Sequence, residues 1–190
     1  MGFLRPVRAL AAAALATGLL LTSAAGPARA DRTIMPPVAG DVSAWAPNSG
    51  WIGSTRLCVQ VGEKQAGNFA PVWQDTCRRY GDAQLWKFGY AKRVGGAVYL
   101  QNMFSGKCLE VIDYSTNYGA PTGQYTCYEG TNQLWRMHWN YQDGYAQFEN
   151  VNSGLCLSVD GLSTAAQTRI VQNPCYSWAA NEQFAPVTIA

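Results

Sequence analysis

The six cysteines are the residues whose type and spacing most restrict the chemistry of this chain. They form three pairs with nineteen residues of separation in each: Cys58 and Cys77, Cys108 and Cys127, and Cys156 and Cys175. An even number of cysteines is typical of disulfide-bonded secreted proteins, and free thiols or metal ligands are the alternative. One disulfide within each pair is the simplest connectivity. Each disulfide would stabilise the fold by about 3 kcal/mol.

Residues that could catalyse a reaction are few. His138 is the only histidine, and it lies on the polar side of the alternating segment 135–139. The sequence contains no nucleophile elbow, zinc-protease helix, P-loop, dinucleotide-binding turn or EF-hand loop. Glu110 and Asp113 could in principle hydrolyse a glycoside, but only their proximity in the sequence suggests it. We therefore predict that the protein is not an enzyme and that it uses no metal or cofactor.

The cysteine pairs belong to a longer repeat with boundaries near 51–92, 93–142 and 143–190. A Cys-apolar-x-Val pattern begins at the first cysteine of each pair. Each copy closes with a related motif: Gln84-Leu85-Trp86, Gln133-Leu134-Trp135 and the weaker Glu182-Gln183-Phe184. Such repetition indicates copies of one small unit that share a core. The bulky residue that ends each motif is predicted to lie in that core.

The hydrophobic pattern within each unit has a period of two. Val59 and Val61 alternate with Cys58 and Gln60, which predicts short strands, and turn signals such as Asp143-Gly144 separate them. No segment after the leader has the pattern of an amphipathic helix. Three units of nearly fifty residues without helices predict a closed all-β structure, because closure hides the strand edges.

The triplicated Cys-Leu-x-Val and Gln-x-Trp motifs resemble those of the ricin B-type lectins over about residues 51–187. The resemblance implies a β-trefoil of three homologous repeats with pseudo-three-fold symmetry and one disulfide in each repeat. It also implies a sugar pocket built from an acid, an aromatic and an Asn-Gln pair. Such a set suits a sugar, which has an apolar face and a rim of hydroxyls.

The middle repeat fits this implied pocket best. Its carbohydrate-binding residues would be Glu110, Asp113, Tyr125, Asn132 and Gln133, with Glu110 in place of the usual aspartate. The outer repeats lack the aromatic: their corresponding residues are Gln60, Asp75, Ala83 and Gln84 in the first and Ser158, Asn173, Asn181 and Glu182 in the third. One sugar site is therefore predicted.

Residues 1–30 are predicted to be a secretory signal peptide. They contain two arginines before an apolar stretch over 9–21, and they end in the A-x-A pattern of Ala28 to Ala30. The apolar stretch is too short to span a bilayer, so we predict a secreted, extracellular protein without membrane insertion.

Residues 31–50 are predicted to be a proline-rich N-terminal extension, and residues 51–190 the trefoil domain. The extension would be a linker, a strap packed on the trefoil through Trp45, or an arm that binds a partner.

Charge argues against one class of partner. The chain has 14 Lys and Arg against 12 Asp and Glu, and without the leader 11 basic residues remain. Nucleic-acid binding needs clustered cations, so it is not expected. The first hypothesis is a lectin-like module for a glycan or polysaccharide, either galactose-type or from plants or cell walls. The alternative is a protein-interaction trefoil with decayed sugar binding, such as a subunit of a secreted toxin or enzyme or a protease inhibitor.

Overall fold

Short strands recur in the same order three times along the chain. The computed structural model describes Gly2 and residues 37–48, 51–52, 55–62, 65–78 and 82–187. Apart from Gly2, the predicted signal peptide lies outside the described residues. The strands are β1 (Val42–Pro47), β2 (Trp51–Ile52), β3 (Thr55–Val61), β4 (Val72–Thr76), β5 (Trp86–Tyr90), β6 (Ala97–Asn102), β7 (Cys108–Val111), β8 (Thr122–Tyr125), β9 (Trp135–Asn140), β10 (Tyr145–Asn150), β11 (Cys156–Val159), β12 (Thr168–Asn173) and β13 (Phe184–Val187).

The helical elements in the described part are all short 3₁₀ turns. They are η1 (Asp82–Gln84), η2 (Ile112–Tyr114), η3 (Thr131–Gln133), η4 (Asp160–Leu162) and η5 (Ala180–Glu182). Among the residues that the structure describes, no helix has the length and apolar character that a membrane crossing requires.

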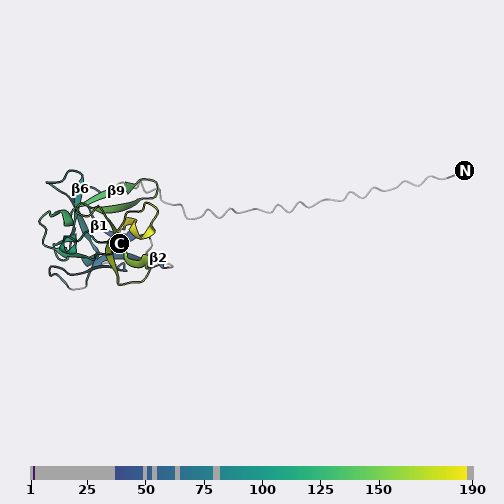
Figure 1. Ribbon diagram of the computed structural model, residues 1–190. Coiled ribbons are helices and arrows are strands. Elements are labelled where there is room, and N and C mark those ends of the chain that lie inside the picture. Colours follow the sequence, from purple (N-terminus) through teal and green to yellow (C-terminus); the bar gives the residue numbers. More distant parts are fainter. Residues whose placement is uncertain are drawn as a thin grey trace. The chain divides into compact units, whose positions relative to one another are not determined.

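Six strands form a closed ring of antiparallel neighbours. The pairs are β1 with β5, β5 with β6, β6 with β9, β9 with β10, β10 with β13, and β13 with β1. The strands β3 and β4, β7 and β8, and β11 and β12 form three hairpins, one for each repeat. Figure 1 shows β1, β6 and β9 in the same folded body. A closed barrel with three hairpins is a β-trefoil, which confirms the predicted fold class.

Strand β1 is part of this barrel, although it lies within the segment predicted as an N-terminal extension. Its residues pair with β13 from Ala44↔Val187 to Pro47↔Phe184. Trp45 is 1% exposed, and its ring packs against Phe88 and Phe148. The barrel therefore begins before residue 51, because β1 carries Trp45 and the core would lack one of its largest side chains without it.

The core is built from the same positions in each repeat. The last residues of the three closing motifs, Trp86, Trp135 and Phe184, are fully buried, as predicted. The indole nitrogens of Trp86 and Trp135 donate to the carbonyls of Val59 and Leu109, at 3.0 and 3.4 Å. These bonds satisfy the buried N–H groups and fix the closing strands against the hairpins.

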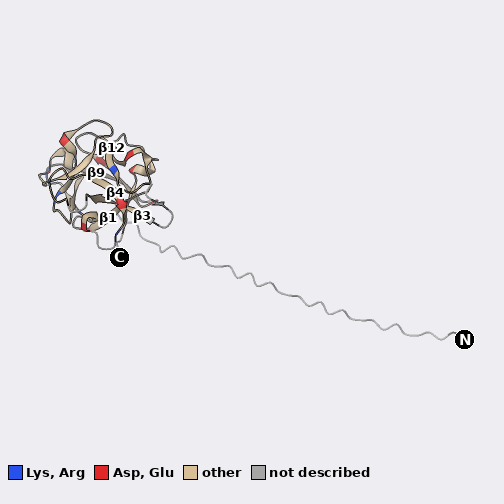
Figure 2. Cartoon of the chain, turned by 90° about the horizontal axis from the view of Figure 1, so that it is seen from below, with Lys and Arg blue, Asp and Glu red and all other residues tan. Residues whose placement is uncertain are grey.

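The three disulfides join the cysteines within each repeat, as predicted. The pairs are Cys58–Cys77, Cys108–Cys127 and Cys156–Cys175, and no described cysteine is free. Each bridge ties a hairpin to the segment that follows it. In Figure 2, acidic and basic residues are spread over several strands and loops of the described part.

Each hairpin contains one buried glutamine that joins it to a loop of a neighbouring repeat. The Nε2 of Gln124 donates to the carbonyls of Gln65 and Gly67, at 2.8 and 2.9 Å. The equivalent donors are Gln172, which bonds Ser115 and Asn117, and Gln74, which bonds Ser163 and Ala165. The contacts run from repeat one to two, two to three and three to one, so the network is cyclic.

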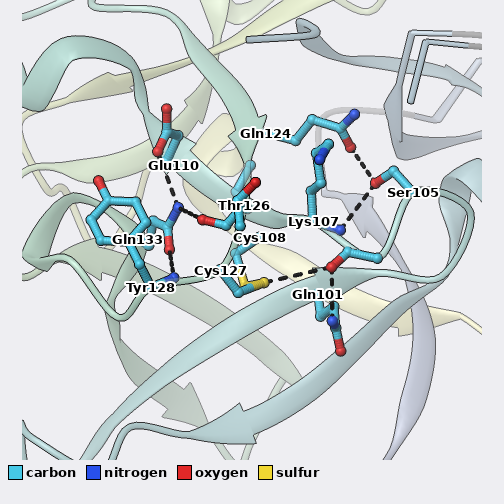
Figure 3. Close-up of a disulfide and its surroundings, with 12 residues drawn as sticks. Gln101, Ser105, Lys107, Cys108, Glu110, Gln124, Thr126, Cys127, Tyr128 and Gln133 are labelled. Atoms are coloured by element: carbon cyan, nitrogen blue, oxygen red, sulfur yellow. Dashed lines mark hydrogen bonds between the residues drawn. A yellow bond between two sulfur atoms is a disulfide. The ribbon is translucent and has the colours of Figure 1, made fainter. Parts of the chain in front are cut away.

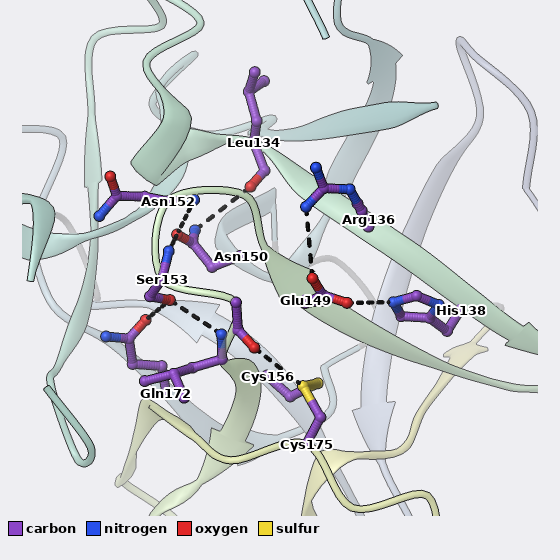
Figure 4. Close-up of polar contacts among 12 residues, drawn as sticks. Leu134, Arg136, His138, Glu149, Asn150, Asn152, Ser153, Cys156, Gln172 and Cys175 are labelled. Atoms are coloured by element: carbon purple, nitrogen blue, oxygen red, sulfur yellow. Dashed lines mark hydrogen bonds and ion pairs between the residues drawn. A yellow bond between two sulfur atoms is a disulfide. The ribbon is translucent and has the colours of Figure 1, made fainter. Parts of the chain in front are cut away.

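We expect Gln172→Leu to lower the free energy of unfolding by about 2 kcal/mol, because two carbonyls lose their donor and the partner Ser153 loses its acceptor (Figure 4). The measurement is a urea titration, with a lower midpoint and an unchanged slope. The control is Gln142→Leu, at an exposed turn position. An unchanged midpoint for Gln172→Leu would show that the network does not hold the repeats together.

Candidate functional site

A pocket of about 380 Å³ opens on the middle repeat, where η2, η3 and β8 meet. Its lining residues are Phe69, Glu110, Asp113, Tyr114, Tyr125, Tyr128 and Asn132. The structure therefore brings together four of the five residues predicted for the site. Gln133, the fifth, does not line the pocket.

Glu110 lines the pocket, and only one of its two carboxylate oxygens is hydrogen-bonded to described residues. It is only 2% exposed. Its Oε2 accepts hydrogen bonds from Asn132 Nδ2 and Gln133 Nε2, both at 3.2 Å, whereas Oε1 accepts none from any residue that the structure describes. Figure 3 shows one carboxylate oxygen directed toward Gln133 and the other pointing away from it. The carboxylate is thus held in one orientation, with an acceptor left over for a ligand.

Gln133 supports the site from behind. Its Oε1 accepts a bond from the Tyr128 backbone N–H at 3.0 Å, and its Nε2 donates to the Thr126 carbonyl at 3.0 Å as well as to Glu110 (Figure 3). The side chain is fully buried. It therefore positions Glu110 and the chain around Cys127, and any effect on binding acts through those groups.

The aromatic wall of the pocket contains more residues than the sequence predicted. The ring of Tyr125 contacts that of Phe69 at a centroid distance of 5.0 Å and that of Tyr128 at 5.9 Å. Tyr128 follows the second cysteine directly, so its position could have suggested a role. Phe69 belongs to the first repeat, and nothing in the motif of the middle repeat points to it.

Tyr128 connects the aromatic wall to the polar base. Its hydroxyl donates to Asn132 Oδ1 at 2.9 Å, and Asn132 in turn donates to Glu110. Burial raises the pKa of Tyr128, which further favours the protonated hydroxyl that donates this bond. A side chain on Gly130 would collide with the ring of Tyr128 and the hydroxyl of Tyr114. The glycine is thus needed for these two tyrosines to pack.

Asp113 and Tyr114 reach the pocket from an unusual backbone conformation. Both have positive φ angles, 56° and 52°. The third repeat has Gly161, with φ 59°, at the position that corresponds to Asp113. A glycine adopts this conformation without steric cost, and aspartate is among the residues with a side chain that tolerate it best. The middle repeat thus keeps an exposed carboxylate where the fold itself would accept glycine.

The pocket is acidic. Glu110 and Asp113 contribute carboxyl groups, and none of the described residues that line it is Lys, Arg or His. An anionic ligand would meet two like charges in a partly desolvated space, which is unfavourable. The pocket instead suits a neutral ligand whose hydroxyls donate to carboxylate oxygens and whose apolar face packs on the aromatic rings.

The ricin-type β-trefoil lectin domain-like family matches three overlapping stretches of the sequence, residues 52–125, 82–173 and 131–190. The chain belongs to this family. No match was found among curated proteins. The matched stretches cover all three repeats, including the two that have no aromatic residue at the position of Tyr125.

Solved structures show the same fold. ThreeFoil, a designed three-fold symmetric protein, is 28% identical, with a TM-score of 0.68, 77% of this chain covered and 98% of the other. The exo-β-1,3-galactanase 1,3Gal43A from Clostridium thermocellum is 25% identical, with a TM-score of 0.67, 79% of this chain covered and 31% of the other. The cytolethal distending toxin of Haemophilus ducreyi is 17% identical, with a TM-score of 0.59, 90% of this chain covered and 96% of the other.

In the first repeat of this lectin-family domain, the residues at the positions of Glu110 and Gln133 form a hydrogen bond with each other. Gln84 Nε2 donates to Gln60 Oε1 at 2.8 Å. Asp75, at the position of the stacking aromatic, forms an ion pair with Arg78 at 3.6 Å. The first repeat thus presents a charged pair where the middle repeat presents a ring.

The third repeat also joins its polar groups to one another, although the buried Asn181 Oδ1 has no hydrogen-bond partner among the described residues. Asn181 Nδ2 donates to Ser158 Oγ at 2.8 Å and to the Val159 carbonyl at 3.0 Å. His138, the only histidine, lies apart from the pocket and bonds Glu149 at 2.8 Å (Figure 4). Among the described residues, no group of His, Cys, Asp or Glu could hold a metal ion.

We expect Glu110→Gln to stabilise the protein at pH 7. Burial raises the pKa of Glu110 above its ordinary value of 4.5, against the opposing effect of the Gln133 and Asn132 hydrogen bonds. A raised carboxyl pKa destabilises the fold when the group is ionised. The penalty is therefore present at neutral pH and disappears as the pH falls through the raised pKa to 4.5. The first repeat shows that glutamine fits, since Gln60 makes the equivalent bond.

Unfolding free energies of the variant and the wild type, measured between pH 7 and pH 4, test this sign. The variant's advantage should shrink as the solution becomes more acidic. Burial also raises the pKa of Glu182, but that residue is common to both proteins and cancels in the difference. An advantage that grows toward acid pH would show that the carboxylate is stabilised, rather than penalised, by its surroundings.

Proposed function

We propose that the protein is a secreted carbohydrate-binding module whose middle repeat binds a neutral, galactose-containing glycan. The observation that carries the proposal is the pairing of an aromatic wall with Glu110, a carboxylate oriented by two amides and open on one side. The three disulfides are consistent with export.

Each pocket group has a separate task in this proposal. Tyr125 packs against the apolar face of the sugar ring. Glu110 Oε1 accepts a hydrogen bond from one sugar hydroxyl, and the exposed Asp113 accepts from another. Because hydroxyl pairs at different ring positions point in different directions, two fixed carboxylates can distinguish one sugar from another.

The galactanase similarity guides the choice of ligand. That enzyme is named for its action on β-1,3-linked galactose, and this chain matches 31% of its length. β-1,3-Galactan and its oligomers are therefore the first polymers to test. We infer binding without cleavage, because recognition of a sugar already accounts for both carboxyl groups of the pocket, Glu110 and Asp113. Release of reducing ends from galactan would contradict this.

Tyr125→Ala should weaken sugar binding by at least about tenfold, since it removes the ring that meets the sugar face. The measurement is a glycan array followed by titration of the strongest ligand, with wild type and variant side by side. Tyr141→Ala is the matched control, because Tyr141 is 69% exposed and lies outside the pocket. Equal binding by Tyr125→Ala and wild type would rule out the pocket as the sugar site.

Asp113→Gly separates binding from folding. Glycine is already present at the equivalent position of the third repeat, so the unfolding free energy should stay within about 1 kcal/mol of wild type. Loss of a charged hydrogen-bond acceptor should weaken sugar binding by roughly tenfold or more. Calorimetric titration and a urea curve on the same preparation measure both quantities. Unchanged affinity would show that the carboxylate does not contact the sugar.

The second candidate function is a protein-interaction trefoil, for example a subunit associated with a secreted toxin. The polar groups of the first and third repeats favour it, because they bond one another and neither repeat has an aromatic residue at the position of Tyr125. A wild-type array without any glycan signal would support this candidate over the first.

A further inference from the structure

We propose that Phe69, a residue of the first repeat, forms a second subsite beside the sugar pocket of the middle repeat. The ligand would then be a chain of at least two sugar units rather than a single terminal sugar. This inference rests on the proposed function and adds the length of the ligand. Three observations support it: the hydrogen bonds that hold the loop 65–70 against β8, the positive φ angle of Phe69, and the contact of its ring with Tyr125.

The loop that carries Phe69 is held rigidly against strand β8. Gln124 donates to the Gln65 and Gly67 carbonyls, and the Phe69 N–H donates to the Gln124 carbonyl at 2.7 Å. Asn68 Oδ1 accepts a bond from the Thr126 N–H at 3.1 Å. These bonds place the Phe69 ring beside Tyr125 before any ligand arrives, so little ordering is needed on binding.

Phe69 occupies a backbone conformation that does not favour a bulky residue. Its φ is 63°, and the symmetry-related residues are Gly119, with φ 73°, and Gln167, with φ 62°. The three are related because each N–H donates to a buried glutamine carbonyl, of Gln124, Gln172 and Gln74 respectively. The fold therefore accepts glycine or a polar residue here. A phenylalanine that is 53% exposed gains little from burial, and this indicates a role in binding.

The contacts described for the pocket connect Phe69 to the polar groups through Tyr125 and Tyr128. Glu110 bonds Asn132, Asn132 bonds Tyr128, and the ring of Tyr128 meets that of Tyr125. The ring of Phe69 continues this series by contact with Tyr125. A pyranose is about as wide as a phenyl ring, so a sugar over Tyr125 leaves Phe69 for the next unit. The volume of about 380 Å³ also exceeds the size of one hexose.

The experiment compares galactose with β-1,3-galactotriose on wild type, Phe69→Gly and Phe69→Tyr, by calorimetric titration. Wild type should bind the trisaccharide more tightly than galactose. Phe69→Gly should weaken trisaccharide binding by about fivefold to tenfold and weaken galactose binding much less, because the second unit loses the ring it contacts whereas the first unit keeps Tyr125. Phe69→Tyr keeps a ring and should retain the preference.

Gln167→Gly is the matched control. It relaxes the same backbone position in the third repeat and leaves the pocket intact, so both affinities should equal those of wild type. Equal weakening of galactose and trisaccharide by Phe69→Gly would place Phe69 in the primary site and overturn the second subsite. No change with either ligand would overturn it while the proposed function stands. If wild type binds neither sugar, the proposed function and this inference both fail.

Discussion

The hydrogen bonds of three buried glutamines are the constraint on which this trefoil depends. Gln74, Gln124 and Gln172 each fasten the loop of one repeat to the hairpin of another. The disulfides act only within repeats, so they cannot set how the repeats meet. Because the network is cyclic, a shift of one repeat disturbs its bonds on both sides. The pocket depends on this arrangement, since its wall combines side chains from two repeats.

A shared frame supports three different polar clusters at equivalent positions. The first repeat uses a pair of amides, Gln60 and Gln84, and the third uses Ser158 with Asn181. In both clusters the polar side chains bond one another, and each leaves one buried group without a partner among the described residues, Gln60 Nε2 and Asn181 Oδ1. In the middle repeat, Glu110 accepts from Asn132 and Gln133 with one oxygen and retains the other. A buried carboxylate is the least favourable of the three for stability, because an ionised group costs more to bury than an amide or a hydroxyl. It is also the one whose free acceptor belongs to a residue that lines the pocket.

Much of the fold could be predicted because its signals are local and repeated. The cysteine spacing and the period-two strands around Val59 and Trp135 indicated three disulfide-closed β units, and a closing residue such as Trp86 indicated the core. Strand β1 escaped this reasoning, since it has no cysteine and pairs with β13 at the other end of the chain. The proximity of Glu110 to Asn132 and Gln133 could be predicted, because all three belong to the repeated motifs of one unit. The contribution of Phe69 could not be predicted, because its place depends on contact between repeats.

The pairing of β1 with β13 also governs how the domain responds to pulling. These strands are antiparallel, so the residue where the barrel begins, Val42, lies near the residue where it finishes, Val187. Force applied between these two points would peel the strands apart one hydrogen-bonded pair at a time, instead of shearing all pairs together. Tension on the chain would therefore open the barrel at this seam first and draw Trp45 out of the core.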